Sequence, residues 1–587
     1  MGRAIKMSPL VVAALALTAL AAGYRFYSRH LATRLFDLDA HRTTPAHRLR
    51  DDVDYIPSNR YILFGHQYAS ITGLSPMLGP AIAVIWGWLP ATLWIVVGAI
   101  FVGAVQDFGA MAVSLRGRGL SIGAITENLV GPRGKTLFHI IIFFLIALAM
   151  GVFVHIIATL FSPQFYPESV LPSTLMIVIA LVGGLGTYRY NWGLLPLTLT
   201  GLVVLVALVG VGIEYPVVGP SIGQWKWLLL GYAFTASVLP VWLLLQPRDY
   251  INSLLLYAGV GAMYAGFILT NPSFAAPAID LHPQGAPAMF PFVFIVIACG
   301  AASGFHALVS SGTSAKQLDK ETDAPFVGYG AMIGESILGL MAVLACTAGF
   351  VSREDWLTRY VSWQSADSLG NNIGAFIGGT SHFLGALGFS KSLGQTFVAV
   401  LVVSFALTSL DSATRLLRYN IAEMGHTFKL DLLNNRFIAS GIAVLAIWFF
   451  AFFEVGGEFA GLILWQLFGT TNQLLAGLAL LAVTIYLLRR GKPLAYTLLP
   501  MALMLLLTLS AMTSNLLDFW SAGQWMLFLT GGSILLLALW LTVESALAVR
   551  KYRQKPLIEE LEIDFGTATI EHNRSSEEKK GGYQWNG

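Results

Sequence analysis

The sequence predicts an all-α polytopic membrane protein of about 15 transmembrane helices, with a five-plus-five inverted repeat that contains two broken helices. Three observations predict this fold. The 587-residue chain is 56% hydrophobic and only 11% charged, whereas soluble domains carry about 25% charged residues. Its apolar residues gather in runs long enough to cross a bilayer. Proline and glycine interrupt two of these runs near their centres.

The predicted spans follow from length. A helix needs about 20 apolar residues to cross a hydrocarbon core of about 30 Å. By that measure the spans are 8–27, 62–86, 90–115, 137–161, 171–190, 193–214, 229–247, 250–270, 289–311, 326–350, 394–418, 437–453, 459–487, 494–512 and 524–549. The first continues into Tyr24-Arg25-Phe26-Tyr27 without a small-residue cleavage site, so we expect a retained helix.

The segments 62–86 and 229–247 are the predicted broken helices. The first reads GLSPMLGP over residues 73–80, and the second contains Pro240. Proline removes a backbone donor and clashes with the preceding turn, so neither segment can form one regular helix. Freed backbone groups are tolerated at membrane depth only inside protein or beside a wet cavity, and broken spans in two halves mark a transporter's binding site. We therefore expect the substrate to contact Gly73, Ser75, Gly79, Thr235 and Ser237.

Ser75-Pro76 is typical of the N-cap and first turn of a helix. The free amides and dipole of that half-helix would face the cavity, where a substrate carboxylate could bind.

Lysine and arginine predict the orientation, because cytoplasmic loops carry more of them. With the N-terminus outside and the C-terminus in the cytoplasm, 29 of the 35 basic residues lie on the cytoplasmic side. The two five-span blocks then begin on opposite sides of the membrane, as an inverted repeat requires. The predicted units are 1–27 (extra helix), 28–61 (cytoplasmic linker), 62–214 (first repeat), 229–418 (second repeat), 437–549 (four added helices) and 550–587 (disordered cytoplasmic tail). The external stretch 351–392 is expected to form a lid or short helices.

Charged and titratable side chains within the predicted spans indicate an ion or proton route. Charges are expensive at a helix centre, so they face the bundle interior. His66, Asp107, His306, Glu335 and Asp411 all fall roughly 5–12 Å below the midplane on the cytoplasmic side. An ion pair between Asp411 and Arg415, four residues apart, is the alternative for Asp411. Gln67, beside His66, and Ser303, in a serine-rich stretch, complete the predicted coupling residues.

Other functional classes are disfavoured. The net charge of +3 is small and dispersed, which excludes a nucleic-acid partner. Cys299 and Cys346 lie in apolar spans without metal-ligand spacing and are expected to be inert. No nucleophile or metal motif indicates an enzyme, and no cofactor is expected beyond a coupling ion, H⁺ or alternatively Na⁺.

Several runs resemble the carbon starvation protein A family. They are FGHQYASI at 64–71 with 73–80, LP at 89–90, GAVQDF at 103–108, LPVWLLL at 239–245, PRDY at 247–250, ACG at 298–300, SGFHAL at 303–308, SSGT at 310–313, GYG at 328–330, LFG at 467–469 and NQL at 472–474, with Asp411, Thr414 and Arg415. The resemblance implies a bacterial inner-membrane secondary transporter of the amino acid–polyamine–organocation superfamily that takes up peptides or pyruvate when carbon is scarce. Many relatives carry a second histidine where this chain has Gln67.

We therefore expect a proton-coupled symporter of pyruvate or a short peptide that works by alternating access in the lipid bilayer. Histidine suits proton coupling because its ordinary pKa is about 6.5. Two alternatives remain: sodium coupling through Ser303 and backbone carbonyls of the first broken helix, and a non-transporting nutrient sensor that signals through its tail. The sequence leaves the oligomeric state open.

Overall fold

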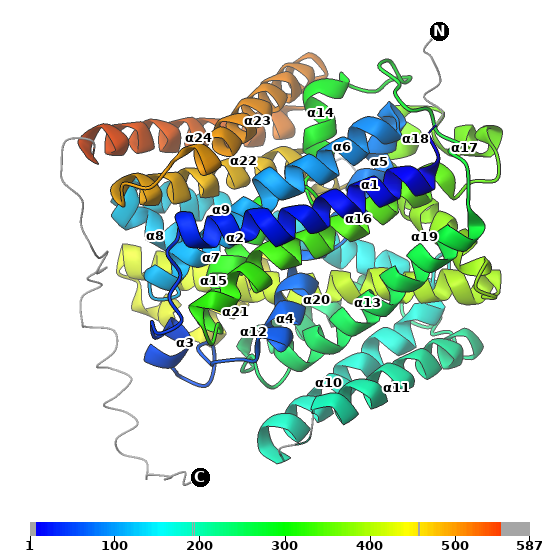
Figure 1. Cartoon of the computed structure of the whole chain (residues 1–587), viewed down its shortest axis with the longest axis horizontal. Coiled ribbons are helices and arrows are strands. Elements are labelled where there is room, and N and C mark those ends of the chain that lie inside the picture. The colour runs from blue at the N-terminus through cyan, green and yellow to red at the C-terminus, as the bar shows by residue number, and fades with distance from the viewer. Residues whose placement is uncertain (1–6, 191, 193, 456–457, 553–587) are drawn as a thin grey trace.

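The computed structural model describes residues 7–190, 192, 194–455 and 458–552, and these residues are predominantly helical (Figure 1). The first twelve helices are α1 (Pro9–Ala22), α2 (Ser28–Arg34), α3 (Pro45–Arg48), α4 (Arg60–Ile71), α5 (Ser75–Ala83), α6 (Trp88–Gly98), α7 (Ala104–Arg116), α8 (Ile122–Leu129), α9 (Pro132–Leu160), α10 (Val170–Tyr190), α11 (Leu194–Glu214) and α12 (Ile222–Val238). The others are α13 (Leu245–Thr270), α14 (Met289–Val296), α15 (Gly304–Gly312), α16 (Gly330–Ala348), α17 (Arg353–Arg359), α18 (Trp363–Asp367), α19 (Leu369–Gly385), α20 (Lys391–Phe428), α21 (Arg436–Phe452), α22 (Ala460–Arg489), α23 (Ala495–Ser521) and α24 (Trp525–Tyr552).

Short elements join or extend these helices. The strands β1 (Glu454–Val455) and β2 (Glu458–Phe459) form a small antiparallel pair. The π-helical turns are η1 (Gly23–Tyr27), η3 (Ala99–Gly103) and η7 (Pro325–Tyr329), and the 3₁₀ turns are η2 (Val84–Trp86), η4 (Pro167–Ser169), η5 (Ser314–Lys316), η6 (Glu321–Asp323) and η8 (Asp431–Asn434).

Ten helical stretches of the described residues are long and apolar enough to cross a membrane. They are Pro9–Arg34, Trp88–Arg116, Pro132–Leu160, Pro167–Gly186, Leu245–Thr270, Glu321–Ala348, Lys391–Phe428, Ala460–Arg489, Ala495–Ser521 and Trp525–Arg550. The bent pair Arg60–Ile71 and Ser75–Trp86 makes an eleventh, and Leu199–Glu214 and Arg436–Phe452 are shorter apolar helices. These helices confirm a multi-pass membrane protein, whereas the larger count of about 15 stays a prediction.

The first interruption lies where the sequence predicts it. α4 ends at Ile71, α5 begins at Ser75, and the two helices are bent by 46°. Pro76 stands in the first turn of α5, where its missing N–H costs no helical hydrogen bond. The break therefore interrupts the helical hydrogen-bond pattern in the middle of the span.

The second interruption does not lie in 229–247, as predicted, but in 297–303. α12 continues to Val238 and Pro240 ends it, so this proline marks the end of one helix rather than a kink within it. The turn that follows leaves the bundle, because the Val241 amide donates to the Val53 carbonyl at 3.0 Å. Between α14 and α15, residues 297–303 are non-helical, and Gly300 adopts φ +87°. The predicted unbroken span 289–311 is therefore the second broken helix.

The two ends of the bundle carry different loops. The linker 35–59 pairs with loops from distant parts of the chain, through Thr43 with Lys320 and Ser58 with Leu318. We call this end the linker face, formed by residues 35–59, 117–131, 239–244, 313–324, 429–435 and 490–494. The opposite end, the vestibule face, carries residues 161–169, 271–288 and 349–390. There the Trp363 amide donates to the Gln284 carbonyl at 2.8 Å, and the Asp280 amide donates to the Trp86 carbonyl at 2.8 Å.

The predicted external stretch 351–392 forms α17, α18 and α19, which lie over α5. The Tyr360 hydroxyl donates to the Ala81 carbonyl at 2.8 Å, and the Trp356 indole donates to the Cys346 carbonyl at 3.1 Å. These two hydrogen bonds fix α17 to α5 and α16.

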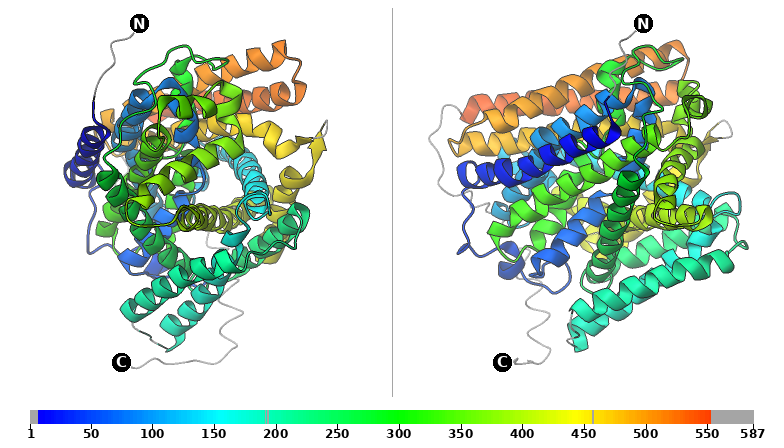
Figure 2. Two further views of the ribbon diagram at one scale, coloured as in Figure 1. Left: turned by 90° about the vertical axis from the view of Figure 1, so that its right-hand side faces the viewer. Right: turned by 45° about the vertical axis from the view of Figure 1, so that its right-hand side comes forward.

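The helix contacts have a mirrored pattern. α9 packs on α20, α21 and α22, while α20 packs on α9, α12 and α13. α4 packs on α13 and α16, while α15 packs on α22 and α7. α10 and α11 form a hairpin at the edge of the bundle, which is visible from two directions (Figures 1 and 2).

Candidate functional site

The two helix breaks lie directly against each other. A Cβ built on Gly79 of α5 would stand 2.5 Å from the carbonyl oxygen of Val296, the last residue of α14. A side chain at this position would therefore push the two broken helices apart. Gly300 of the second break lies beside Pro76, with 3.7 Å between a Cβ built on the glycine and the Cβ of the proline.

A small chamber lies between the breaks, with a volume of about 20 Å³. Its walls are Ile71, Gly73, Ser75, Leu145, Ile146, Ala149, Met150, Phe153, Cys299, Phe305, Ser409 and Phe468. This volume holds about one water molecule, so the chamber is nearly closed in this conformation. Both breaks, α9, α20 and α22 contribute to the walls, which places the chamber in the centre of the bundle.

A larger vestibule of about 700 Å³ leads from the vestibule face toward the chamber. Ser75 and Phe468 line both cavities, and the Phe468 ring stacks on Trp465 at 4.3 Å. Phe468 therefore stands between the vestibule and the chamber. The vestibule carries the carboxylates of Asp367 and Asp518, and no lysine or arginine is among the described residues that line it.

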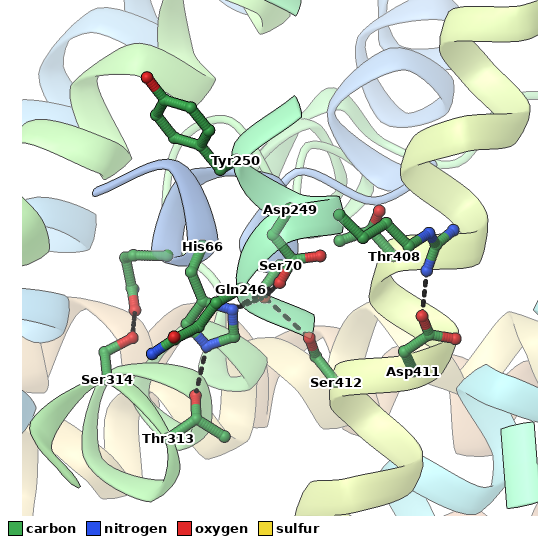
Figure 3. A network of polar contacts seen from close by, with 12 residues as sticks. His66, Ser70, Gln246, Asp249, Tyr250, Thr313, Ser314, Thr408, Asp411 and Ser412 are labelled. Atoms are coloured by element: carbon green, nitrogen blue, oxygen red, sulfur yellow. Dashed lines mark hydrogen bonds and ion pairs between the residues drawn. The ribbon is translucent and has the colours of Figure 1, made fainter. Parts of the chain in front are cut away.

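The first buried polar group joins α4, α13 and α20. His66 Nδ1 lies 2.5 Å from an Asp249 carboxylate oxygen, and both side chains are fully buried (Figure 3). The Ser70 hydroxyl lies 3.5 Å from the same oxygen and 2.8 Å from the Ser412 hydroxyl. His66 Nε2 faces the Thr313 hydroxyl at 3.4 Å. An imidazole and a carboxylate in this arrangement can share a proton one helical turn from the first break.

Gln67 binds the end of the second broken helix. Its amide nitrogen donates to the Ser310 hydroxyl at 2.8 Å, and its amide oxygen accepts from the Ser314 hydroxyl at 2.6 Å. The residue thus connects the two broken helices on the linker side of the chamber.

Asp411 forms a buried ion pair with Arg248. Both side chains are fully buried, and the Tyr232 hydroxyl donates to the same carboxylate oxygen at 2.5 Å. The Arg248 guanidinium also lies 5.5 Å from the centre of the Tyr232 ring. The predicted alternative, an ion pair between Asp411 and Arg415, is not formed, because Arg415 binds Asp54 instead.

A third buried polar group, besides those of His66 and Asp411, contains Asp107, His306 and Glu335. His306 Nδ1 lies 3.2 Å from Asp107 and Nε2 lies 3.3 Å from Glu335, and all three side chains are fully buried. The group joins α7, α15 and α16 beside the second break.

The linker closes its face of the bundle through Asp54. The carboxylate accepts from Arg415 at 2.8 Å, from Arg418 at 3.1 Å and from the Tyr419 hydroxyl at 2.6 Å. Burial would raise the pKa of Asp54, but the positive charges of Arg418, Arg415 and Lys316 outweigh it and hold the pKa below its usual range. Because its pKa is depressed in the folded protein, the Asp54 carboxylate stabilises the fold fully above about pH 4. This stabilisation is lost only as the pH falls further.

We expect Asp54→Asn to loosen the linker at neutral pH. The substitution leaves two buried guanidinium groups without their carboxylate, at a cost of about 2–3 kcal/mol. Cleavage of the purified protein by trypsin at the exposed Arg48 and Arg50 should accelerate about tenfold or more. The control is Asp431→Asn, which removes an exposed carboxylate on the linker face outside the linker itself. Equal cleavage rates in the two variants would mean that Asp54 does not hold the linker in place.

The structure brings most of the predicted site residues together. Gly73 and Ser75 line the chamber, Ser75 and Gly79 line the vestibule, and His66, Gln67, Asp107, Ser303, His306, Glu335 and Asp411 occupy the buried polar groups around it. Thr235 and Ser237 do not belong to the site. The Thr235 hydroxyl donates within α12 to Gly231 and its side chain is exposed, while the Ser237 hydroxyl donates to Phe234. Their prediction was wrong because α12 is not the second broken helix.

Sequence reasoning missed Arg248 and Asp249. The predicted spans end at 247 and restart at 250, which leaves both residues in a short loop. In the structure α13 begins at Leu245, so both lie in its first turns and are fully buried. The local signal for these residues is the run Pro247-Arg248-Asp249. It places two opposite charges directly after a proline, and a proline is typical of the first turn of a helix.

Comparison with protein families gives one match over nearly the whole described chain. The family described as carbon starvation protein CstA matches residues 8–358 and 349–511. The peptide transporter CstA of Escherichia coli K12 is 32% identical over 572 residues, covering 87% of this chain and 81% of the relative. The pyruvate/proton symporter BtsT of the same strain is 31% identical over 549 residues, covering 79% of this chain and 75% of the relative.

Two solved structures of similar shape have lower sequence identity to this chain. A manganese transporter of Eremococcus coleocola, in complex with an aromatic bis-isothiourea compound, has a TM-score of 0.47 and 13% identity, covering 86% of this chain and 99% of that structure. Mhp1, a nucleobase-cation-symport-1 family transporter, has a TM-score of 0.40 and 14% identity, covering 86% of this chain and 95% of that structure.

Proposed function

The chain belongs to the carbon starvation protein CstA family, so it is a membrane transport protein and not an enzyme, and we propose that it imports short peptides or pyruvate together with protons by alternating access. The observation that carries this proposal is the central chamber, which two broken helices enclose and Phe468 separates from the vestibule. Two breaks of the helical hydrogen-bond pattern at membrane depth are the arrangement from which secondary transporters build a binding site.

The inverted repeat remains part of the proposal, with a revised membership. Exchanging α4–α5 with α14–α15, α7 with α16, α9 with α20, α12 with α21, and α13 with α22 maps several contacts of one set onto contacts of the other. Among them, α9 with α21 maps onto α20 with α12, α9 with α22 onto α20 with α13, and α7 with α22 onto α16 with α13. This pattern supports two repeats of five spans, with α10 and α11 as an insertion at the edge. The linker face would be cytoplasmic and the vestibule face external, in the bacterial inner membrane, because the basic loops gather on the linker face.

Proton coupling rests on the pair His66 and Asp249. The pair joins the first broken helix to α13, and its two members can hold or release one proton as the helices separate. Sodium coupling through Ser303 has less support, because the Ser303 hydroxyl already donates to Asn472 at 3.2 Å and accepts from it at 2.9 Å. Roles for Asp107, Glu335 and Asp411 in gating the proton stay predictions.

The vestibule favours a peptide over pyruvate. A short peptide carries an ammonium group that can face Asp367 and Asp518, whereas pyruvate presents only a negative charge to the same carboxylates. Burial raises the pKa of Asp367 above its ordinary value, and a nearby ammonium would lower it again by favouring the charged form.

Uptake by purified protein in vesicles tests the function. We expect radiolabelled dialanine to accumulate when the vesicle interior is alkaline and to enter about tenfold faster than pyruvate. Replacing sodium with choline should leave this uptake unchanged, and deleting residues 555–587 should do the same. Uptake that collapses in choline would favour sodium coupling, and no uptake of either solute, with signalling lost on removal of the tail, would favour the sensor.

The double variant Asp367→Asn and Asp518→Asn should reverse part of the substrate preference. We expect the KM for dialanine to rise about three- to tenfold and the KM for pyruvate to fall, because an attractive field for cations is removed. The matched control is Glu354→Gln, an exposed acid on α17 that does not line the vestibule. Unchanged KM values in the double variant would remove the vestibule charges from substrate selection.

A further inference from the structure

The second break carries three potential metal ligands of different chemistry. One ligand atom each from Cys299, His306 and Glu335 lie within 4.8 Å of one another, and all three side chains are buried. His306 Nε2 and Glu335 Oε2 are 3.3 Å apart. Two ligands bound to one tetrahedral metal at about 2.0–2.1 Å stand roughly 3.3 Å apart, so this spacing fits one metal ion between them.

Buried polar atoms without hydrogen-bond partners also belong to this cluster of ligands. Both carboxylate oxygens of Glu335 and Nε2 of His306 are buried and have no hydrogen-bond partner, although Nε2 and one of these oxygens make the ion-pair contact described above. Buried polar atoms are almost always satisfied in folded proteins, so this side of the group has capacity for another ligand. A cation would satisfy the imidazole and the carboxylate at once.

Asp107 completes the arrangement from behind. It lies 3.2 Å from His306 Nδ1, on the ring nitrogen opposite the one that faces Glu335. A carboxylate that accepts from the second ring nitrogen is the usual support of a metal-bound histidine, because it fixes the ring orientation and the tautomer. Asp107 would therefore position His306 without touching the metal.

We propose that Cys299, His306 and Glu335 bind a thiophilic divalent cation of the Zn²⁺ class, and that the bound ion inhibits transport. A thiolate, an imidazole and a carboxylate suit Zn²⁺ and disfavour Mg²⁺ and Ca²⁺, which prefer oxygen ligands alone. The ion would join the second break, α15 and α16, and Cys299 also lines the chamber. It would thus hold these elements in one conformation while alternating access requires them to move. The inhibition rests on the proposed transport function, whereas the binding does not.

Cobalt and cadmium binding to the purified full-length protein tests the site. We expect one equivalent of Cd²⁺ to produce a thiolate-to-metal charge-transfer band in the ultraviolet, and one equivalent of Co²⁺ to produce the visible spectrum of a tetrahedral site. Cys299→Ser should abolish the charge-transfer band. Cys346→Ser is the matched control, because Cys346 is the other cysteine of the chain and is also buried. A band that persists in Cys299→Ser, or its absence from the wild type, would overturn the proposal.

Two further measurements separate metal ligation from a structural role. Glu335→Gln should weaken Co²⁺ binding at least tenfold, and Asp107→Asn should weaken it by about 10–100-fold, as loss of a supporting carboxylate does. X-ray absorption of the Zn²⁺-loaded wild type requires no variant and should show one sulfur at about 2.3 Å with nitrogen or oxygen neighbours at about 2.0–2.1 Å. A zinc environment without sulfur would overturn the assignment.

Uptake measured with and without Zn²⁺ tests the inhibition. Each variant is compared with itself, so altered basal uptake does not affect the result. Zn²⁺ should reduce dialanine uptake about tenfold in the wild type and in Cys346→Ser, and leave Cys299→Ser unchanged. Zn²⁺ binding without inhibition would overturn the inhibitory role. Absence of dialanine uptake in every sample would instead refute the proposed function, and the spectra would still decide the metal site.

Discussion

Replacing Arg248 with methionine should destabilise the protein by about 3–5 kcal/mol. The guanidinium neutralises Asp411 where both side chains are fully buried, so its removal leaves a carboxylate with only the Tyr232 hydroxyl as partner. The free energy of unfolding, measured by denaturant titration in mixed micelles, should fall by this amount, and Asp411→Leu should show a loss of similar size.

The double variant Arg248→Met and Asp411→Leu provides the decisive comparison. Removing both charges eliminates the uncompensated ion, so most of the lost stability should return, apart from about 1–3 kcal/mol for the unpartnered Tyr232 hydroxyl. Arg50→Met is the control, because its ion pair with Asp52 is exposed and should contribute at most about 1 kcal/mol. Additive losses in the double variant would mean that the two charges do not stabilise each other.

Asp249→Asn should abolish concentrative uptake while preserving exchange of substrate across the membrane. The amide cannot take up and release a proton with His66, so an imposed pH gradient could no longer drive accumulation. Exchange of internal for external dialanine needs only the loaded carrier to change conformation. We expect accumulation to fall at least 100-fold and exchange to fall less than about tenfold, both measured in the same vesicles.

Asp431→Asn is the matched control for this variant, because Asp431 is an exposed acid on the linker face. It should retain both accumulation and exchange. If Asp249→Asn accumulated dialanine with the wild-type dependence on pH, the His66–Asp249 pair would play no part in coupling.

The two breaks differ in how plainly the sequence encodes them. Residues 73–80 contain two glycines and two prolines, so the first break follows from local backbone chemistry alone. In 297–303 only Gly300 is a helix breaker, and most of that break depends on packing against Pro76 and α16. Pro240 has the stronger local signal and misled the prediction, because a proline that ends a helix and one that interrupts a helix have the same local sequence.

The sequence predicted those site residues that are charged and lie within a long apolar segment. Asp107, Glu335 and Asp411 are isolated carboxylates in long hydrophobic segments, and the cost of burying them predicted that they face inward. Their partners were not predictable in the same way. His66 and Asp249 are separated by 183 residues, and nothing in either local sequence specifies that the two side chains meet.

The adjacent positions of Arg248 and Asp249 on α13 have a consequence for how the bundle moves. Successive residues of a helix point about 100° apart, so α13 contacts α20 with one side chain and α4 with the next. The first contact is an ion pair between opposite charges, whereas the second depends on the proton that His66 and Asp249 share in the proposed mechanism. When the first broken helix moves, Arg248 should therefore keep α13 joined to α20, and the contact between His66 and Asp249 should be the polar contact of α13 that changes.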